Sequence, residues 1–447
     1  MQRRDFLALT GAASLAAPAA KRPNILFLLT DDQRKDTISA LGNPHIRTPN
    51  FDRLVRSGVS FNNAYCMGGF SPAVCLPSRM MMQRGVSWFT VQRQKEVGAC
   101  MAGTMNDAGY ETFHLGKKGN EDTKAHAFYQ HNHYVQPDDN AERLRGQPSR
   151  QLADRVIEFL KQQWKKDKPF FLYLADSAPH DPRVAPPEYL AKYDPKKIPL
   201  PANYKPFHPF DNGEMFVRDE KLAPWPRTED EIRKHLQEYY AVVTYMDEQI
   251  GRIFDALREM GEYENTIIVH TSDQGIAIGS HGLMGKQNLY QPSMSPALIF
   301  AGPGIPKGKQ VDGFAYLFDI FPTLCGLAGI TAPRGLEGVS QAAVIQGKRK
   351  SVRDAIFLAY RDLQRGVRKG DWKLIRYPKI NRTQLFNLKS DPRELKDLAG
   401  DPAQAGKVRE LMDELRAQQK LYGDTAPLET PGAPGADVTV DFFRQGK

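Results

Sequence analysis

Four short apolar runs, separated by longer stretches with helical spacing, set the pattern of this chain. Their continuous apolar character is typical of strands that are buried on both faces of a sheet. Strands that alternate with amphipathic helices favour an α/β fold built on a large mixed, mainly parallel sheet flanked by helices. The predicted strands cover residues 24–30, 170–175, 266–271 and 297–300.

Polar side chains follow three of these runs at the point where each predicted strand ends. Asp31 and Asp32 come after the first run, His180 follows the second, and Asp273 and Gln274 follow the third. One polar residue at a strand end only opens a loop. Three such ends with Asp or His indicate a site, because open α/β sheets bind ligands at the carboxyl ends of their strands.

The spacing of apolar residues and the Pro content divide the rest of the chain into a long loop, a long helix and a C-terminal part. Apolar residues at spacings of three and four predict one long helix over 229–260, and the Pro-rich segment 181–228 before it predicts a long functional loop. After residue 345 the pattern changes to a small antiparallel sheet, a helix over 402–421 and an extended tail. We therefore expect a catalytic domain over 21–345 and a C-terminal subdomain over 346–447. The short strands expected in that subdomain cover 355–360, 366–367 with 372–377, and 384–388.

The N-terminus has the features of an export signal. Arg3 and Arg4 precede an apolar run over 8–17, and small residues for cleavage follow it. This order predicts a twin-arginine signal peptide over residues 1–20, recognition by the twin-arginine export machinery, and a periplasmic or secreted protein. No uncharged apolar stretch reaches the roughly 18 residues of a membrane helix, so we expect no membrane span.

Net charge limits the classes of binding partner, and the cysteine pattern limits the metal and redox chemistry, that we expect of this chain. The chain has 447 residues and a formal net charge of +9, which suits an anionic partner such as a sulfated polysaccharide, or simply a solvated basic surface. Nucleic-acid-binding motifs are not found, so nucleic acid is not expected. The four cysteines form no CxxC pair, which argues against zinc and dithiol chemistry, and their pairing stays open.

The two acidic strand ends together predict a metal site. Asp31, Asp32 and Asp273 offer carboxylate oxygens and Gln274 offers an amide oxygen. Four oxygen ligands suit calcium better than zinc. Taken alone, the pair at 31 and 32 more often caps a loop than binds a metal.

A cysteine motif brings in a known family. Cys75, Pro77, Ser78 and Arg79 follow the spacing Cys-x-Pro-Ser-Arg, which resembles the signature of the type I, formylglycine-dependent sulfatases of the alkaline-phosphatase-like superfamily. Other segments resemble the same family, so that the likeness spans about residues 22–400. They cover residues 22–33, 48–54, 272–275, 281–286 and 370–388.

The resemblance implies a mechanism. In that family the cysteine, here Cys75, is oxidised by a formylglycine-generating enzyme, and the hydrated aldehyde attacks sulfur beside calcium. Arg79 would steady the hydrate and the metal ligands, and Lys117 would bridge sulfate and nucleophile. His180 would bind sulfate and protonate the leaving oxygen, and Lys286 would hold a sulfate oxygen. The alternative for Cys75 is an unmodified buried thiol.

Two positions depart from the family. Gly119 stands where the family has a histidine, which implies slower sulfate release unless His114 or Asn120 substitutes, and Ser295 stands where it has an arginine. We expect a sulfatase acting on a sulfated carbohydrate or another small sulfate ester. A related hydrolase of phosphate mono- or diesters, and a weakly active binder of sulfated glycans, remain as alternatives.

Overall fold

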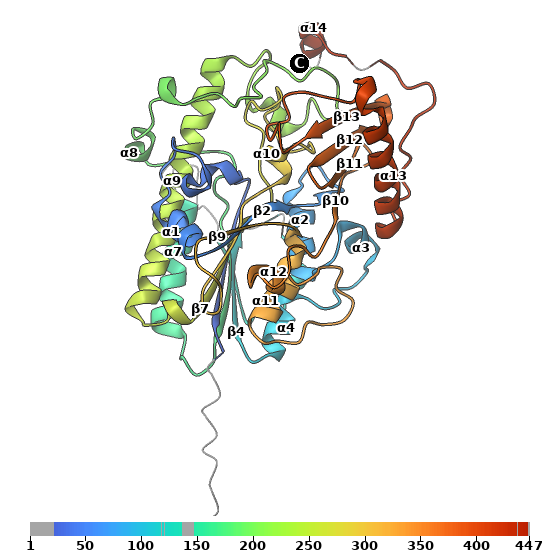
Figure 1. Cartoon of the computed structure of the whole chain (residues 1–447). Helices are drawn as coiled ribbons and strands as arrows, with labels where there is room; N and C mark the ends of the chain where they lie inside the picture. The colour runs from blue at the N-terminus through green and yellow to red at the C-terminus, as the bar shows by residue number, and fades with distance from the viewer. Residues whose placement is uncertain (1–21, 118, 120, 136–146, 436, 446–447) are drawn as a thin grey trace, which may run out of the picture.

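An eight-stranded sheet forms the centre of the protein in the computed structural model (Figure 1). The structure describes residues 22–117, 119, 121–135, 147–435 and 437–445, so the signal peptide expected over 1–20 lies outside the described residues. The strand order is β5-β4-β6-β1-β7-β8-β2-β9. The strands are β1 (Asn24–Thr30), β2 (Gly58–Tyr65), β4 (Glu111–Lys117), β5 (His131–Val135), β6 (Phe170–Ala175), β7 (Thr266–Ser272), β8 (Leu298–Ala301) and β9 (Lys309–Tyr316).

Strand direction places the candidate residues together. β1 pairs in parallel with β6 on one side and with β7 on the other, whereas β8 runs antiparallel to both of its neighbours. The sheet is therefore mixed and mainly parallel, as the sequence predicts. Because β6, β1 and β7 are adjacent and parallel, the polar residues that follow them meet at one edge.

Helices cover both faces of this sheet. Along β1, Leu26 and Leu28 pack with the apolar faces of α1, α7 and α9, while Ile25, Phe27 and Leu29 face the opposite side with α2, α4 and α11. This alternation is the period of two that a strand buried on both faces requires. The helices of the two layers are α1 (Pro49–Ser57), α7 (Gln147–Glu158) and α9 (Glu229–Glu259), and α2 (Cys75–Arg84), α3 (Trp88–Arg93), α4 (Met101–Asp107), α5 (Thr123–His126), α11 (Ile320–Leu327) and α12 (Ala342–Ile345).

A second, smaller sheet follows the central one, as expected for the C-terminal part. Its order is β13-β12-β11-β10-β3, and the pairs from β10 to β13 are antiparallel. The short β3 comes from the N-terminal half, which the sequence pattern did not reveal. Gly68 allows this contact, because a Cβ there would lie 2.2 Å from the Ala359 carbonyl oxygen. The strands are β3 (Gly68–Gly69), β10 (Ala355–Tyr360), β11 (Gln364–Lys369), β12 (Trp372–Tyr377) and β13 (Arg382–Asn387).

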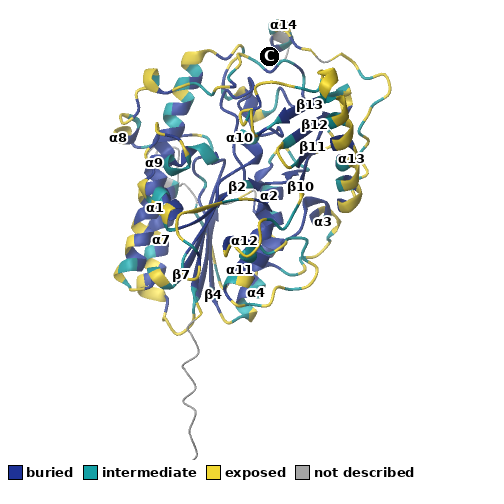
Figure 2. Ribbon diagram, in the orientation of Figure 1, coloured by how far each residue is buried: buried dark blue, intermediate teal, exposed yellow. Residues whose placement is uncertain are grey.

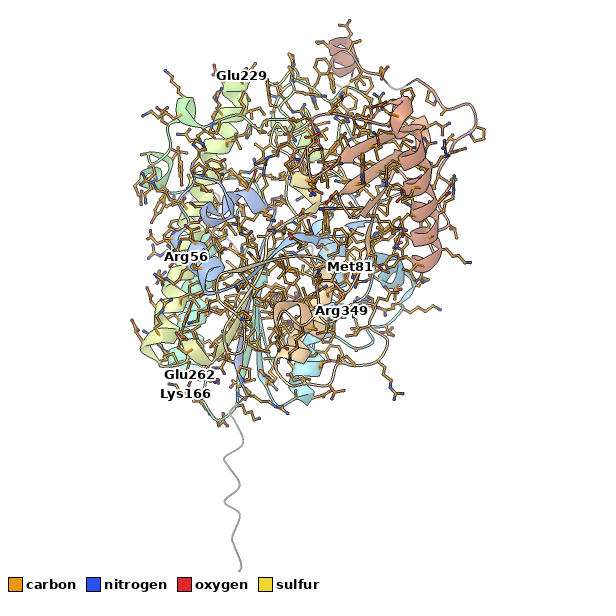
Figure 3. All side chains as sticks on the ribbon, in the orientation of Figure 1. Arg56, Met81, Lys166, Glu229, Glu262 and Arg349 are labelled. Carbon is orange, nitrogen blue, oxygen red and sulfur yellow. The ribbon has the colours of Figure 1, made fainter. Side chains whose placement is uncertain are left out.

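The remaining segments complete the molecule. The long helix predicted over 229–260 is α9, and the helix predicted over 402–421 is α13 (Ala405–Tyr422), which packs on β11. Figure 2 shows the strands of the central sheet buried and the outer faces of α9 and α13 exposed, and Figure 3 shows side chains filling the space between ribbons. Within the described residues, no helix has the length and apolar character needed to cross a membrane. The other short helices are α8 (Pro187–Leu190), α10 (Gln291–Met294) and α14 (Val440–Gln445).

A buried ion pair ties the small sheet to the central part. Lys373 of β12 donates to Glu394 at 2.7 Å, and both side chains are fully buried. The other Glu394 oxygen accepts from the Gln291 backbone N–H at 2.8 Å. Although burial alone would raise it, the Lys373 ammonium and His281 lower the pKa of Glu394 to about 2.

Removal of the Glu394 charge should destabilise the protein in a pH-dependent way. Since the folded pKa lies below the usual value, the stabilisation is present above about pH 4.5 and is lost as pH falls toward 2. Glu394→Gln leaves a buried ammonium unpaired, so we expect a loss of about 3–5 kcal/mol at pH 7 that shrinks below pH 4.5. Unfolding midpoints across this pH range measure it.

Glu414→Gln is the matched control. Glu414 pairs with the half-exposed Lys369 at 2.7 Å in the same subdomain. A surface pair of this kind contributes at most about 1 kcal/mol. Equal losses for the two variants would contradict the role given to Glu394.

Candidate active site

The four residues predicted as metal ligands lie together in the structure. Asp31 and Asp32 follow β1, Asp273 and Gln274 follow β7, and all four are fully buried. The Asp32 backbone N–H donates to Asp273 Oδ1 at 3.2 Å, and Gln274 Nε2 donates to Asp32 Oδ1 at 3.0 Å. The two strand ends thus form one polar cluster.

This cluster has the composition of a site for a hard cation. Ligand atoms of Asp31, Asp32, Asp273 and Cys75 lie within 4.8 Å of one another. Gln274 Oε1 is buried and has no hydrogen-bond partner among the described residues. Buried polar atoms are nearly always satisfied, and calcium takes carboxylate and amide oxygens, so this donor set fits calcium.

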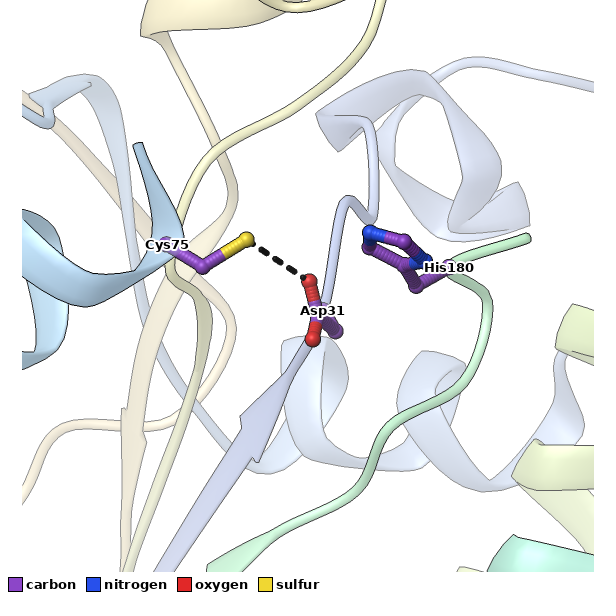
Figure 4. Close-up of side chains that lie close together, drawn as sticks. All are labelled: Asp31, Cys75 and His180. Atoms are coloured by element: carbon purple, nitrogen blue, oxygen red, sulfur yellow. Dashed lines mark hydrogen bonds between the residues drawn. The ribbon is translucent and has the colours of Figure 1, made fainter. Parts of the chain in front are cut away.

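Cys75 stands at the first position of α2, beside the acidic cluster. Its Sγ donates to Asp31 Oδ1 at 3.3 Å, and it accepts from Gln274 Nε2 at 3.2 Å and from Lys286 Nζ at 3.3 Å. Figure 4 shows Asp31 between Cys75 and His180. Burial and the neighbouring Asp31 carboxylate raise the pKa of the Cys75 thiol well above its usual range, so the unmodified side chain is not a thiolate at neutral pH.

Arg79 lies one helical turn after Cys75 and connects the acidic residues. Its Nε donates to Asp273 Oδ2 at 2.9 Å and its Nη2 to Asp31 Oδ2 at 3.1 Å, while Nη1 binds Glu121. Positions 75 and 79 therefore share one face of the helix, as predicted. Burial would raise the pKa of Asp31, but Lys117 and Arg79 hold it well below its usual range.

The other three predicted residues complete the cluster. Lys117, at the end of β4, binds Asp31, and Lys286 Nζ lies 2.8 Å from both Asp32 carboxylate oxygens. His180 Nε2 lies 3.8 Å from Asp32 Oδ2, and its Nδ1–H donates to the Asp181 carbonyl at 2.7 Å. The side chains of Lys117 and His180 are 17% and 19% exposed, whereas Lys286 is buried. The cluster is therefore open to solvent at Lys117 and His180.

Sequence reasoning missed two residues that contact this machinery. Glu121 is fully buried against Arg79, and burial raises its pKa to about 7 although Arg79 opposes the shift. Asp219 accepts from Gln287 Nε2 at 2.8 Å and lies 4.0 Å from Lys286 Nζ. Asp219 belongs to the Pro-rich segment that the sequence marked as functional, but no sequence signal singled out Glu121.

Gly119 and Ser295 occupy the two positions where the sequence departs from the family pattern, and the structure describes the surroundings of both. Gly119 has a φ of +91°, a conformation that glycine adopts without strain, and a Cβ there would meet nothing within 4 Å. His114 is buried, with Nδ1 2.8 Å from Asn132 Oδ1, and the described contacts of Cys75 do not include it. Asn120 lies outside the described residues. Ser295 donates its hydroxyl to the Ala64 carbonyl at 2.9 Å.

Comparison with known proteins gives a consistent result. The sequence model of the Sulfatase family matches residues 23–330, and that of the N-sulphoglucosamine sulphohydrolase C-terminal region matches 279–421. The chain is 27% identical to the N-acetylglucosamine-6-O-sulfatase of Bacteroides thetaiotaomicron, over 95% of this chain and 91% of that protein.

Solved structures agree with this match. One similar structure is a complex with its substrate D-glucosamine-2-N,6-O-disulfate, with 25% identity, a TM-score of 0.75, and coverage of 92% of this chain and 100% of that one. The phosphonate monoester hydrolase of Agrobacterium radiobacter shares the fold, with a TM-score of 0.73 at 22% identity over 89% of this chain and 96% of that one.

Arg79 provides a test of the cation site. Arg79→Lys keeps the charge but replaces the fork that contacts Asp31 and Asp273 together with a single ammonium. Residues that hold metal ligands typically contribute about 10- to 100-fold to metal affinity, so calcium should stabilise this variant only at correspondingly higher concentrations. Thermal unfolding midpoints at increasing calcium concentration measure the effect.

Arg84→Lys on the same helix is the control. Arg84 makes a similar forked contact with Asp122, at 2.6 and 2.8 Å, away from the predicted ligands. It should keep the calcium dependence of the parent protein. If Arg79→Lys also keeps it, Arg79 does not hold a cation site together.

Proposed function

We propose that this chain, which belongs to the sulfatase family and is a sulfuric ester hydrolase, removes sulfate from a sulfated carbohydrate with a formylglycine at Cys75 and a bound calcium ion. The position of Cys75 carries the proposal. Its Sγ contacts a carboxylate of the candidate cation site and a buried lysine at the same time. That is where a nucleophile has to stand for attack on an anionic ester.

The cofactors supply what the unmodified side chains lack. Calcium, held by Asp31, Asp32, Asp273 and Gln274, would add positive charge next to the sulfate, and a hydrated formylglycine would supply a hydroxyl nucleophile at position 75. A formylglycine-generating enzyme is the partner that this modification requires. The fit of the donor set and the non-ionised thiol support both assignments.

The chain's own residues position the ester and handle its charge and proton. Lys117 and Lys286 carry the positive charges that flank Asp31, Asp32 and Cys75, so they are placed to hold sulfate oxygens. His180 has its Nδ1–H fixed by a carbonyl, which leaves Nε2 to exchange a proton with the leaving oxygen. Arg79 fixes two carboxylates and keeps the cluster rigid.

Relatives and composition support a carbohydrate substrate. The relative from Bacteroides thetaiotaomicron is named an N-acetylglucosamine-6-O-sulfatase, and the similar solved structure is a complex with D-glucosamine-2-N,6-O-disulfate. The net charge of +9 suits a polyanionic glycan. The twin-arginine pattern of residues 1–20 supports export to the periplasm or secretion, which would bring the enzyme to extracellular glycans.

The modification of Cys75 can be tested directly. Protein made together with a formylglycine-generating enzyme should give a peptide whose mass shows an aldehyde at position 75. Cys75→Ala should abolish sulfate release while its unfolding midpoint stays near that of the parent. Cys66→Ala is the matched control, because Cys66 is also a buried free thiol but its sulfur lies 3.8 Å from Met294 Sδ. Full activity of Cys75→Ala would rule out this nucleophile.

The substrate class requires a paired assay. We expect sulfate release from glucosamine 6-O-sulfate and its N-sulfated form, with much lower kcat/KM for phosphate and phosphonate monoesters of the same alcohol. Since the phosphonate monoester hydrolase shares only the fold, a higher kcat/KM for its class of substrate would overturn the proposal. Binding of sulfated sugars without any release would instead indicate a glycan-binding protein.

A further inference from the structure

A polar cavity lies next to the candidate active site. It has a volume of about 350 Å³, and segments far apart in the sequence line it. Arg34, Lys35 and Asp36 come from the turn after β1, Arg368 comes from β11, and Arg393 follows the small sheet. Four of these five charged residues are cationic.

The single carboxylate of the lining is already paired twice. Arg34 makes a forked contact with Asp36, with Nε at 2.8 Å and Nη2 at 2.6 Å, and Arg393 Nη1 lies 3.3 Å from the same carboxylate. Arg34 also donates to the Ala277 carbonyl at 2.8 Å. Asp36 therefore offers little to neutralise the other two cations of the cavity.

Lys35 and Arg368 have no carboxylate partner within ion-pair distance among the described residues. Lys35 Nζ donates to the carbonyls of Phe61 and Asn62, at 3.4 and 2.9 Å. Burial, with Arg368 nearby, lowers the pKa of Lys35 to about 8 against the opposing effect of Asp312. Lys35 thus has a charge that is poorly compensated.

Arg368 is held in place by aromatic rings and not by an acid. It is buried, with its guanidinium carbon 5.5 Å from the centre of the Tyr65 ring and 5.2 Å from that of Phe314, and it donates to the Tyr65 hydroxyl. Buried charges are normally paired, because burial of an uncompensated charge is costly. Two cations at one cavity, neither of them in an ion pair among the described residues, form a ready site for an anion.

We propose that this cavity binds a second oxyanion, a sulfate group, between Lys35 and Arg368. The cavity and the candidate active site share a wall. Arg34 stands two residues after Asp32, and a Cβ on Gly275, next to Gln274, would lie 3.6 Å from Arg34 Cα and 1.9 Å from the carbonyl oxygen of Pro292, which lines the cavity.

The sulfate group has two possible sources with the same chemistry. It is either free inorganic sulfate, the product of the reaction, or a sulfate on another position of a multiply sulfated glycan. The second source rests on the function proposed above, whereas the first does not. Binding is measured in the Cys75→Ala background, which lacks the proposed nucleophile, so neither ligand is turned over during the measurement. The binding result therefore stands even if the proposed hydrolysis proves wrong.

Titration calorimetry with two probes tests the cavity. Inorganic sulfate and a disaccharide with one sulfate on each sugar are titrated into Cys75→Ala protein with and without Lys35→Met. A charged hydrogen bond contributes enough that its loss should weaken anion binding about 10- to 100-fold. Lys35→Arg, which keeps the charge, should retain binding, and the exposed Lys309→Met is the matched control.

Each outcome decides the question. If Lys35→Met weakens the binding of inorganic sulfate but not of the disaccharide, the free anion is the ligand. If Lys35→Met weakens the binding of the disaccharide, the ligand is a sulfate of the glycan. Arg368→Gln provides a second test from another element, should Lys35→Met fail to fold. If both variants bind both probes as tightly as the Lys309→Met control, the cavity is not an anion site.

Discussion

Three carboxylates buried side by side at the ends of β1 and β7 are the constraint on which the rest of this structure depends. Asp31, Asp32 and Asp273 would repel one another strongly away from water unless positive charge lay among them. Arg79 supplies this charge to two of them, and Lys117 and Lys286 supply it to Asp31 and Asp32. Gln274 Oε1, buried and without a hydrogen-bond partner among the described residues, is the oxygen that a bound cation would engage.

The architecture around this cluster follows from the need to hold charges from distant parts of the chain. Adjacent parallel strands deliver the acids, β4 delivers Lys117, and α2 delivers Cys75 and Arg79 on one helical face. The small sheet is fixed to the same region, since Glu394 joins Lys373 of β12 to the backbone of Gln291. Both sheets are thereby tied to the residues that surround the site.

Local sequence patterns predict most of the strands and most residues of the candidate site, but they do not predict contacts between residues outside such patterns. Apolar runs give strands, and a polar residue after a run gives its position at the sheet edge, so Asp31, Asp273 and His180 could be placed from sequence. Glu121 could not, because it follows no run and belongs to no motif, and its role comes only from contact with Arg79. The pairing of β3 with β10 was equally invisible, since a two-residue strand has no period.

The lysines around Cys75 and the cations of the cavity, Lys35 and Arg368, differ in how their charges are balanced. Around Cys75 every lysine faces a carboxylate, so the charges are balanced before a substrate arrives and an anion has to compete with acids for them. Lys35 and Arg368 face no such competitor within ion-pair distance in the described part of the chain, so an anion there would relieve an existing cost. A balanced cluster suits a group that must leave after each turnover, whereas an unbalanced one suits a group that stays bound.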